Sequence, residues 1–277
     1  MSTSPRSAAE RRVDPLAVVL GTDEIASAVA IRLLRSGHGV VMCHDPERPV
    51  IRRGMSFHDV LWGEMVTLDG VAGIPMESAF ELRLADVSLS AVRVSSLGLV
   101  DLLPVGPFDV LVDARHVAGS MVPDLRNLAG LAIGIGPFFR SGINCDAAIS
   151  TRPGNDIAIR TGSVPGRSSD ATAGEHHLIC ASTSGRWRTS LVPGVRVFRG
   201  MVVGHLDRTP VTTPQDGMLR GIARDGIEVP EGAEIVEVDT RNRWRARWTG
   251  VDDGAAEVAE ATTRALALHL CVAGTSH

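Results

Sequence analysis

The chain of 277 residues contains no lysine, so its 28 basic residues are all arginine. This absence excludes Schiff-base chemistry, the lysine of a phosphate-binding loop, and any prosthetic group attached through a lysine side chain. We therefore expect neither biotin nor lipoate as a cofactor.

The sequence also has few cysteines and no long apolar run. Its four cysteines form no Cys-x-x-Cys pair, so we expect neither a zinc ribbon nor a disulfide framework, and we assign no metal ligands. No run approaches the roughly 18 apolar residues that span a bilayer, and the N-terminus lacks the apolar centre of a signal peptide. We expect a cytoplasmic protein with reduced thiols and no membrane partner.

The charge balance gives no sign of a nucleic-acid partner. The formal net charge is only -4 and is spread along the chain, whereas nucleic-acid-binding domains carry a basic surface. The 44% hydrophobic content is ordinary for a globular protein, and the length favours two domains. A homo-oligomer is compatible with these numbers.

The stretch from Ala17 to Asp45 predicts a β-α-β unit. Ala17 to Leu20 form a short apolar strand and Gly21 makes a turn. Apolar residues then recur every fourth position on one helix face, before a second strand at Val40 to Cys43. Such a unit favours a mostly parallel sheet of the Rossmann-like kind.

Later segments extend this sheet. Val92 to Val94, Val110 to Val112 and Leu131 to Ile135 read as buried strands. Asp69-Gly70 is a hairpin signal between two alternating segments. The segment IRRGMSFHDVLW between them predicts a loop and one short helix capped by Ser56.

An internal repeat follows. Residues 185–206 match residues 217–238 at an offset of 32, with Gly194 on Gly226 and Gly200 on Gly232. The glycines supply turns and the alternating aliphatic residues fill a small core. The pattern resembles the barrel-sandwich hybrid fold of biotinyl and lipoyl carrier domains, here without the lysine that carries their cofactor.

We therefore expect an α/β protein with four parts. They are a flexible tail at 1–14, a Rossmann-like domain with a mostly parallel sheet at 15–170, a small all-β barrel-sandwich hybrid domain at 178–240, and a C-terminal segment at 241–277 whose helix packs back on the core. Helical spacing of apolar residues from Ala255 to Leu270 supports the last part.

Several segments together resemble accessory proteins of the selenium-dependent molybdenum hydroxylase system, a setting related to xanthine dehydrogenase maturation. The matching stretches include LGTDEIASAVAIRLLRSGHGVVM, IRRGMSFHDV, FDVLVDAR, IGIGPFFRSGINCDAAIST and DGMLRGIARDGIEVPEGAEIVEVD. The resemblance implies a maturation factor with a molybdenum hydroxylase-type client protein. The chain departs from the family in its first turn, where Asp23 replaces a glycine, and in the loop containing Phe138.

The candidate ligand residues follow the strand ends, where open α/β sheets bind their ligands. Gly21 meets the first requirement of a dinucleotide loop, but Asp23 and Glu24 place two carboxylates near the phosphates. An alternative interpretation is that Asp23 caps the helix. The remaining candidates are Asp45 for a ribose hydroxyl, Arg52 and Arg53 for a phosphate or carboxylate, and the anion-binding turn containing Gly134 and Gly136. At the end of another strand, Asp113 could bind a hydroxyl or a metal and Arg115 an anion; the alternative is that the two form an ion pair that ties two loops together.

Three functions remain open at this stage. The first is an accessory factor that binds a nucleotide-like or anionic ligand in a Rossmann-like cleft, and is more plausibly non-catalytic than an enzyme. The second is an NAD(P)-dependent or nucleotide-using enzyme, against which Asp23 counts. The third is a non-catalytic scaffold that has lost nucleotide binding. Convergence of Asp45, Arg52, Asp113 and Arg115 on one open pocket would favour a ligand.

Overall fold

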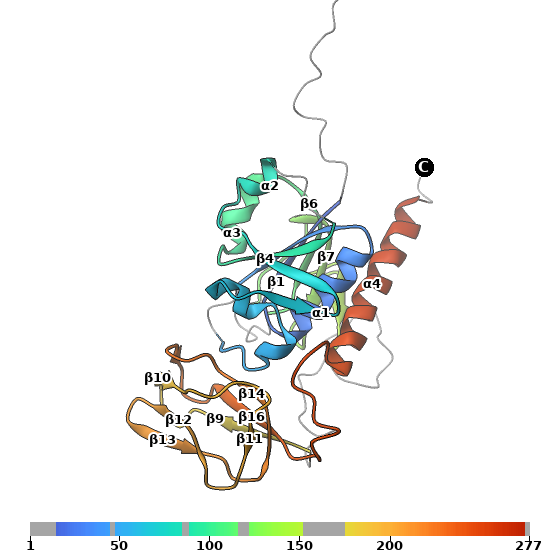
Figure 1. Ribbon diagram of the computed structural model, residues 1–277. Helices are drawn as coiled ribbons and strands as arrows, with labels where there is room; N and C mark the ends of the chain where they lie inside the picture. Colours follow the sequence, from blue (N-terminus) through green and yellow to red (C-terminus); the bar gives the residue numbers. More distant parts are fainter. Residues whose placement is uncertain (1–14, 45–47, 85–88, 116–121, 152–174, 275–277) are drawn as a thin grey trace, which may run out of the picture.

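A computed structural model describes residues 15–44, 48–84, 89–115, 122–151 and 175–274. The expected tail at 1–14, Asp45 and the glycine- and serine-rich stretch at 152–174 lie outside these residues. The chain forms a mixed α/β structure with one large, mostly parallel sheet, two antiparallel sheets and a long C-terminal helix (Figure 1).

The large sheet has eight strands in the order β3-β4-β5-β2-β1-β6-β7-β8. Every neighbouring pair is parallel except the β3/β4 hairpin, which turns at Asp69 and Gly70 with positive φ at both, as predicted. The strands are β1 (Leu16–Leu20), β2 (Gly39–Cys43), β3 (Val66–Leu68), β4 (Val71–Pro75), β5 (Ala91–Ser95), β6 (Phe108–Asp113), β7 (Ala129–Ile135) and β8 (Ala147–Ile149).

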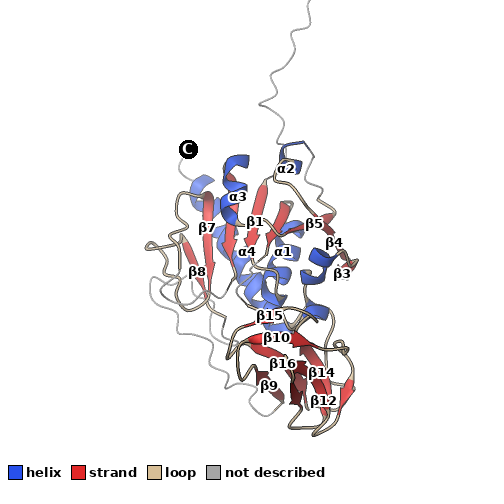
Figure 2. Cartoon of the chain, turned by 90° about the vertical axis from the view of Figure 1, so that its left-hand side faces the viewer, coloured by secondary structure: helices blue, strands red, loops and turns tan. Residues whose placement is uncertain are grey.

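The two faces of this sheet are covered differently. Helices α1 (Glu24–Arg35) and α4 (Asp253–Gly274) pack side by side on one face, where their apolar residues join the strands in the larger core. In the described part of the chain, the other face carries the short helices α2 (Glu81–Leu84) and α3 (Leu99–Leu102), the turn η3 (Leu103–Val105) and loops (Figure 2). The carboxyl ends of β1, β2 and β6 converge at one edge of the sheet.

The segment after β2 differs from the prediction. It forms two 3-10 turns, η1 (Arg53–Met55) and η2 (His58–Trp62), rather than a loop and one helix capped by Ser56. η2 begins after Phe57, and no side chain caps it. The bulky residues of this segment, such as Phe57, are drawn into the core against Gly73 of β4, and this burial outweighs the capping preference of a serine.

The repeat forms two four-stranded antiparallel sheets. One has the order β13-β12-β10-β15 and the other β11-β14-β16-β9. Their strands are β9 (His176–Cys180), β10 (Gly185–Arg188), β11 (Arg196–Val197), β12 (Val202–Leu206), β13 (Thr209–Thr212), β14 (Gly217–Ile222), β15 (Glu228–Val229) and β16 (Glu234–Asp239). Within the described residues, this pairing closes neither sheet into a barrel.

The two halves of the repeat are interlocked. β10 of the first half pairs with β15 of the second, and β14 of the second half pairs with β11 of the first. The matched glycines have matched conformations, with φ of 91° at Gly194 and 85° at Gly226, and 79° at Gly200 and 78° at Gly232. A third core cluster around Trp187 lies between the sheets. The sequence repeat is thus a structural repeat, while the domain boundaries drawn from it stay predictions.

Candidate functional site

The turn between β1 and α1 brings the protein's own carboxylates to the helix N-terminus. Gly21 has φ of 112°, a conformation that favours glycine, and lies against the carbonyl of Ala114. The Asp23 Oδ1 atom accepts a hydrogen bond of 2.9 Å from the Ala26 backbone N–H. Asp23 is therefore the N-cap, and a carboxylate takes one of the N–H groups that a bound phosphate uses in a dinucleotide site.

Arg52 joins this turn to the all-β part of the molecule. Its Nη1 donates to Glu24 Oε1 at 2.9 Å, while its Nε and Nη2 donate to Glu237 Oε2 and Oε1 at 2.6 and 3.0 Å. The side chains of Arg52, Glu24 and Glu237 are only 14%, 9% and 1% exposed. Burial alone would lower the pKa of Arg52, but Glu24 and Glu237 raise it above its ordinary value, so the guanidinium stays charged.

A second arginine extends the same network toward α4. Arg220 on β14 contacts Glu237 through Nε at 3.3 Å and hydrogen-bonds Asp252, which precedes α4. Burial raises the pKa of Asp252, but Arg220 and Arg52 outweigh this effect and hold it below its ordinary value. We call Glu24, Arg52, Arg220, Glu237 and Asp252 the charge clamp. It connects the first turn of α1, the β14-β16 pair and the start of α4.

Arg53 is engaged in a separate contact. Its Nη1 donates to Asp59 Oδ2 at 2.7 Å and its Nε donates to the Ile222 carbonyl at 3.1 Å. Arg224 approaches the other oxygen of Asp59 at 2.9 Å. The predicted Arg52–Arg53 pair is therefore divided among three acidic partners, Glu24 and Glu237 for Arg52 and Asp59 for Arg53, and both arginines reach the all-β part.

Asp113 and Arg115 lie at the end of β6, as predicted, and bond to each other. Arg115 Nε and Nη2 donate to Asp113 Oδ1 and Oδ2 at 3.0 and 2.7 Å, and the Asp113 side chain is fully buried. The alternative left by the sequence was a pair that ties two loops together, but these residues lie two positions apart and hold one turn, in which the Arg115 backbone N–H also donates to Asp113 Oδ1 at 3.1 Å. Arg115 keeps 26% of its side chain exposed.

The glycines of the later turn differ from each other. A Cβ atom at Gly134 would lie 2.0 Å from the Phe139 ring, so Gly134 serves the packing of Phe139. Gly136 has φ of 124° and open space on that side. Asp45 lies outside the described residues. The predicted residues are thus divided among a capped turn, the charge clamp and the Asp113–Arg115 pair, and ligand binding by them stays a prediction.

Sequence reasoning missed an aromatic and histidine cluster beside this edge. His58 Nδ1 and Thr22 Oγ1 are 2.8 Å apart, and the His58 ring centroid lies 5.4 Å from that of His44 and 4.8 Å from that of Trp62. The Arg224 guanidinium lies over the Trp62 ring at 4.7 Å. Burial, His44, Arg53 and Arg224 lower the pKa of His58 to about 3, so its imidazole is neutral at physiological pH.

Three further observations concern the thiol of Cys145, metal binding and membrane-spanning helices. Cys145 is buried, and burial raises the pKa of its thiol to about 11, which disfavours the reactive thiolate. No group of three His, Cys, Asp or Glu side chains among the residues that the structure describes could hold a metal ion. No helix in that part of the chain is long and apolar enough to cross a membrane.

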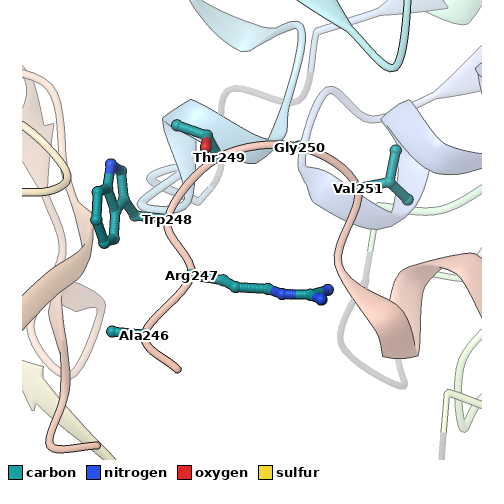
Figure 3. A pocket seen from close by; sticks show the side chains of 6 residues that line it. All are labelled: Ala246, Arg247, Trp248, Thr249, Gly250 and Val251. Atoms are coloured by element: carbon teal, nitrogen blue, oxygen red, sulfur yellow. The ribbon is translucent and has the colours of Figure 1, made fainter. Parts of the chain in front are cut away.

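A surface pocket of about 280 Å³ lies along the segment that leads to α4, and is lined by residues 246–251 (Figure 3). The Arg247 side chain extends along it, while the Trp248 side chain points away toward the all-β part. Trp248 is closely held, because a Cβ at Gly194 would meet its indole and a Cβ at Gly54 would meet its carbonyl oxygen. The predicted site residues do not line this pocket.

No family model matches the chain. It is 29% identical over 267 residues to the uncharacterized protein YqeB of Escherichia coli strain K12, covering 91% of this chain. The match covers 47% of YqeB, so the chain spans about half the length of the curated relative it matches.

Two solved structures show distant similarity. A succinylglutamate desuccinylase/aspartoacylase from Rhodobacter sphaeroides is 18% identical, with a TM-score of 0.19 and coverage of 51% of this chain and 61% of that one. A protein described as a putative member of that family, from Shewanella amazonensis, is 10% identical, with a TM-score of 0.24 and coverage of 83% and 91%. At these scores neither likeness carries an argument about activity.

These comparisons correct the resemblance expected from the sequence. The matching solved structures are described as desuccinylase/aspartoacylase proteins, and neither they nor YqeB is described as an accessory protein of the selenium-dependent molybdenum hydroxylase system. The expected family and the expected role as a maturation factor are therefore wrong. The segments that suggested them lie in the mostly parallel sheet, its turns and the repeat, whose residues are determined by turns and packing rather than by one function. The expectations about partners stay predictions.

Proposed function

We propose that the chain is a structural binding module in which the ligand edge of the Rossmann-like sheet holds the all-β part in place. The observation that carries the proposal is Arg52, which bridges Glu24 at the N-terminus of α1 and Glu237 on β16. In a dinucleotide-binding protein the first turn of this helix receives the pyrophosphate. Here the first turn supplies two carboxylates, and their partners are a backbone N–H group and an arginine.

Electrostatics supports this role over nucleotide binding. A nucleotide phosphate would lie against Asp23 and Glu24, and like charges within a few ångströms repel more strongly near a protein surface than in bulk water. To attract the phosphate, Arg52 would have to leave two buried carboxylates. Uncovering one partner of a buried ion pair costs about 3–5 kcal/mol.

We further infer that the all-β part has the barrel-sandwich arrangement of the biotinyl and lipoyl carrier domains. The 32-residue repeat, the exchange of β11 and β15 between halves and the shared apolar core support this inference. The chain has no lysine to carry a prosthetic group. The turn between β12 and β13 has Asp207 and Arg208 instead, so the role we propose for this part is structural.

The test is calorimetric titration of the purified protein with NAD, NADP and ATP, with and without Mg²⁺. The proposal predicts no heat of binding from any of them. The Asp23→Gly variant is titrated in parallel, because it removes the carboxylate at the turn and restores the glycine of a dinucleotide loop. Binding by the unaltered protein would refute the proposal, and more so if Asp113→Asn abolished it.

A further inference from the structure

Two exposed aromatic side chains of the all-β part each stack with an arginine. Phe198 is 51% exposed, and the Arg196 guanidinium lies 5.2 Å from its ring centroid. Trp244 is 82% exposed, and Arg243 lies over its ring at 4.7 Å. Aromatic rings with this exposure contribute less buried apolar area to the fold than core aromatics do.

Both pairs lie at the same end of one sheet. Arg196 on β11 is opposite Met218 on β14, and Met218 is opposite Asp239 at the end of β16. These three residues lie side by side across the sheet. Phe198 follows β11 and Trp244 follows β16, so the chain segments that carry them both leave the sheet past this row. Figure 1 shows the chain after β16 leaving this end of the all-β part before it turns toward α4.

The surrounding charge is positive. Arg199 and Arg245 are also exposed, and we call Arg196, Phe198, Arg199, Arg243, Trp244 and Arg245 the arginine–aromatic patch. Within the described part of the chain, the side chains of its four arginines form no ion pair, although the Arg199 backbone N–H donates to Asp216 at 2.8 Å. In contrast, the arginines at the sheet edge, such as Arg52 and Arg53, are committed to acidic partners.

We propose that the arginine–aromatic patch is a binding site for single-stranded nucleic acid. Bases stack on aromatic rings without regard to sequence, and arginines bind the phosphates between them. In each pair the arginine lies over the ring, and a base would stack on the exposed part of the ring. The net charge of the whole chain conceals this site because acidic residues elsewhere outweigh its four arginines.

The stacking favours a nucleic acid over an anionic membrane. A tryptophan that enters a membrane interface places its ring among lipid chains. Here the ring would carry a stacked guanidinium with it, and burying that charge in hydrocarbon is costly. In a nucleic-acid strand, a base can stack on each ring while a neighbouring phosphate binds the guanidinium, so neither group is placed in hydrocarbon. The inference goes beyond the proposed structural role and does not depend on it.

The experiment measures fluorescence anisotropy of labelled 15-nucleotide oligo(dT) and oligo(U) with the full chain at low salt. We expect binding whose affinity falls with salt. The slope of log K, the association constant, against the log of the salt concentration should lie between 0 and about -3, because four arginines contact at most four phosphates. Trp244→Ala should weaken binding about 5- to 150-fold, the effect of one lost base stack. Arg245→Glu should also weaken it, and the charge-matched Arg264→Glu on the exposed face of α4 should not.

Circular dichroism and unfolding midpoints of each variant establish that it is folded. Failure of both oligonucleotides to bind would overturn the inference. So would equal binding by the Trp244→Ala variant and the unaltered protein, or equal loss from Arg245→Glu and Arg264→Glu. Sedimentation with phosphatidylserine vesicles forms the second arm, and binding to vesicles but not to oligonucleotides would assign the patch to a membrane surface instead.

Discussion

Acid should destabilise this protein through His58. Its imidazole is 4% exposed and its pKa is lowered to about 3 by burial, His44 and two arginines, from an ordinary value of 6.5. As pH falls below 6.5, this histidine binds a proton in the unfolded chain but stays neutral in the folded one. Its contribution to stability is therefore complete above that pH and is lost progressively between pH 6.5 and about 3.

The size of the effect follows from the width of this window. Each pH unit inside it changes the free energy of unfolding by about 1.4 kcal/mol, so His58 alone should cost about 2 kcal/mol between pH 7 and pH 5. Urea unfolding at several pH values measures it. In His58→Asn, whose amide can still meet Thr22, the difference in stability between the two pH values should shrink by about this amount.

His269 supplies the matched control for this experiment. It is exposed on α4, so His269→Asn makes the same substitution away from the buried cluster. His38 and His176, whose pKa values burial also lowers, titrate in every variant and cancel in the comparison. If His58→Asn and the unaltered protein lose stability in parallel as pH falls, the buried neutral state of His58 is refuted.

Three other outcomes follow from the structure. Gly54→Ala should lower the free energy of unfolding by about 1–3 kcal/mol, because its Cβ would lie 2.3 Å from the Trp248 carbonyl oxygen. The control Gly98→Ala, whose Cβ would lie 3.6 Å from its nearest atom, should cost no more than about 1 kcal/mol. Equal losses of stability in urea unfolding would contradict the close approach at Gly54. Asp23→Ala should cost about 1 kcal/mol by the same assay and Asp23→Asn much less, since asparagine also caps helices; equal costs would refute the cap. A thiol reagent at pH 8 should modify the exposed Cys180 and Cys271 in the folded protein, and the buried Cys43 and Cys145 only after unfolding; rapid modification of all four would contradict their burial.

Local patterns in the sequence predicted much of the fold. The strand at Val110 to Val112 and the Asp69-Gly70 hairpin depend on neighbours close in the chain, and short-range patterns detect them. The repeat was found by matching two segments at an offset of 32 residues, although its strands pair between the two halves. The two 3-10 turns after β2 were missed because tertiary burial of Phe57 and Val60 determines them.

The site was harder to predict for a physical reason. Sequence position placed Arg52, Asp113 and Arg115 at the ligand edge, but the partner of Arg52 is Glu237, which lies 185 positions away along the chain. No local pattern distinguishes an arginine that will bind a ligand from one that a distant strand will neutralise. The alternation in EIVEVD would have placed Glu237 on the face opposite Val236 and Val238, toward solvent, whereas the structure buries it as well.

The central claim is that the charge clamp joins the sheet edge to the all-β part, and a double-mutant cycle between Arg52 and Glu237 tests it most directly. Arg52→Met, Glu237→Gln and the double variant are compared with the unaltered protein by urea unfolding. The account predicts that Arg52→Met alone costs about 3–5 kcal/mol and that the double variant costs less than the sum of the single ones by at least about 1 kcal/mol. Additive effects within about 0.5 kcal/mol would contradict the clamp.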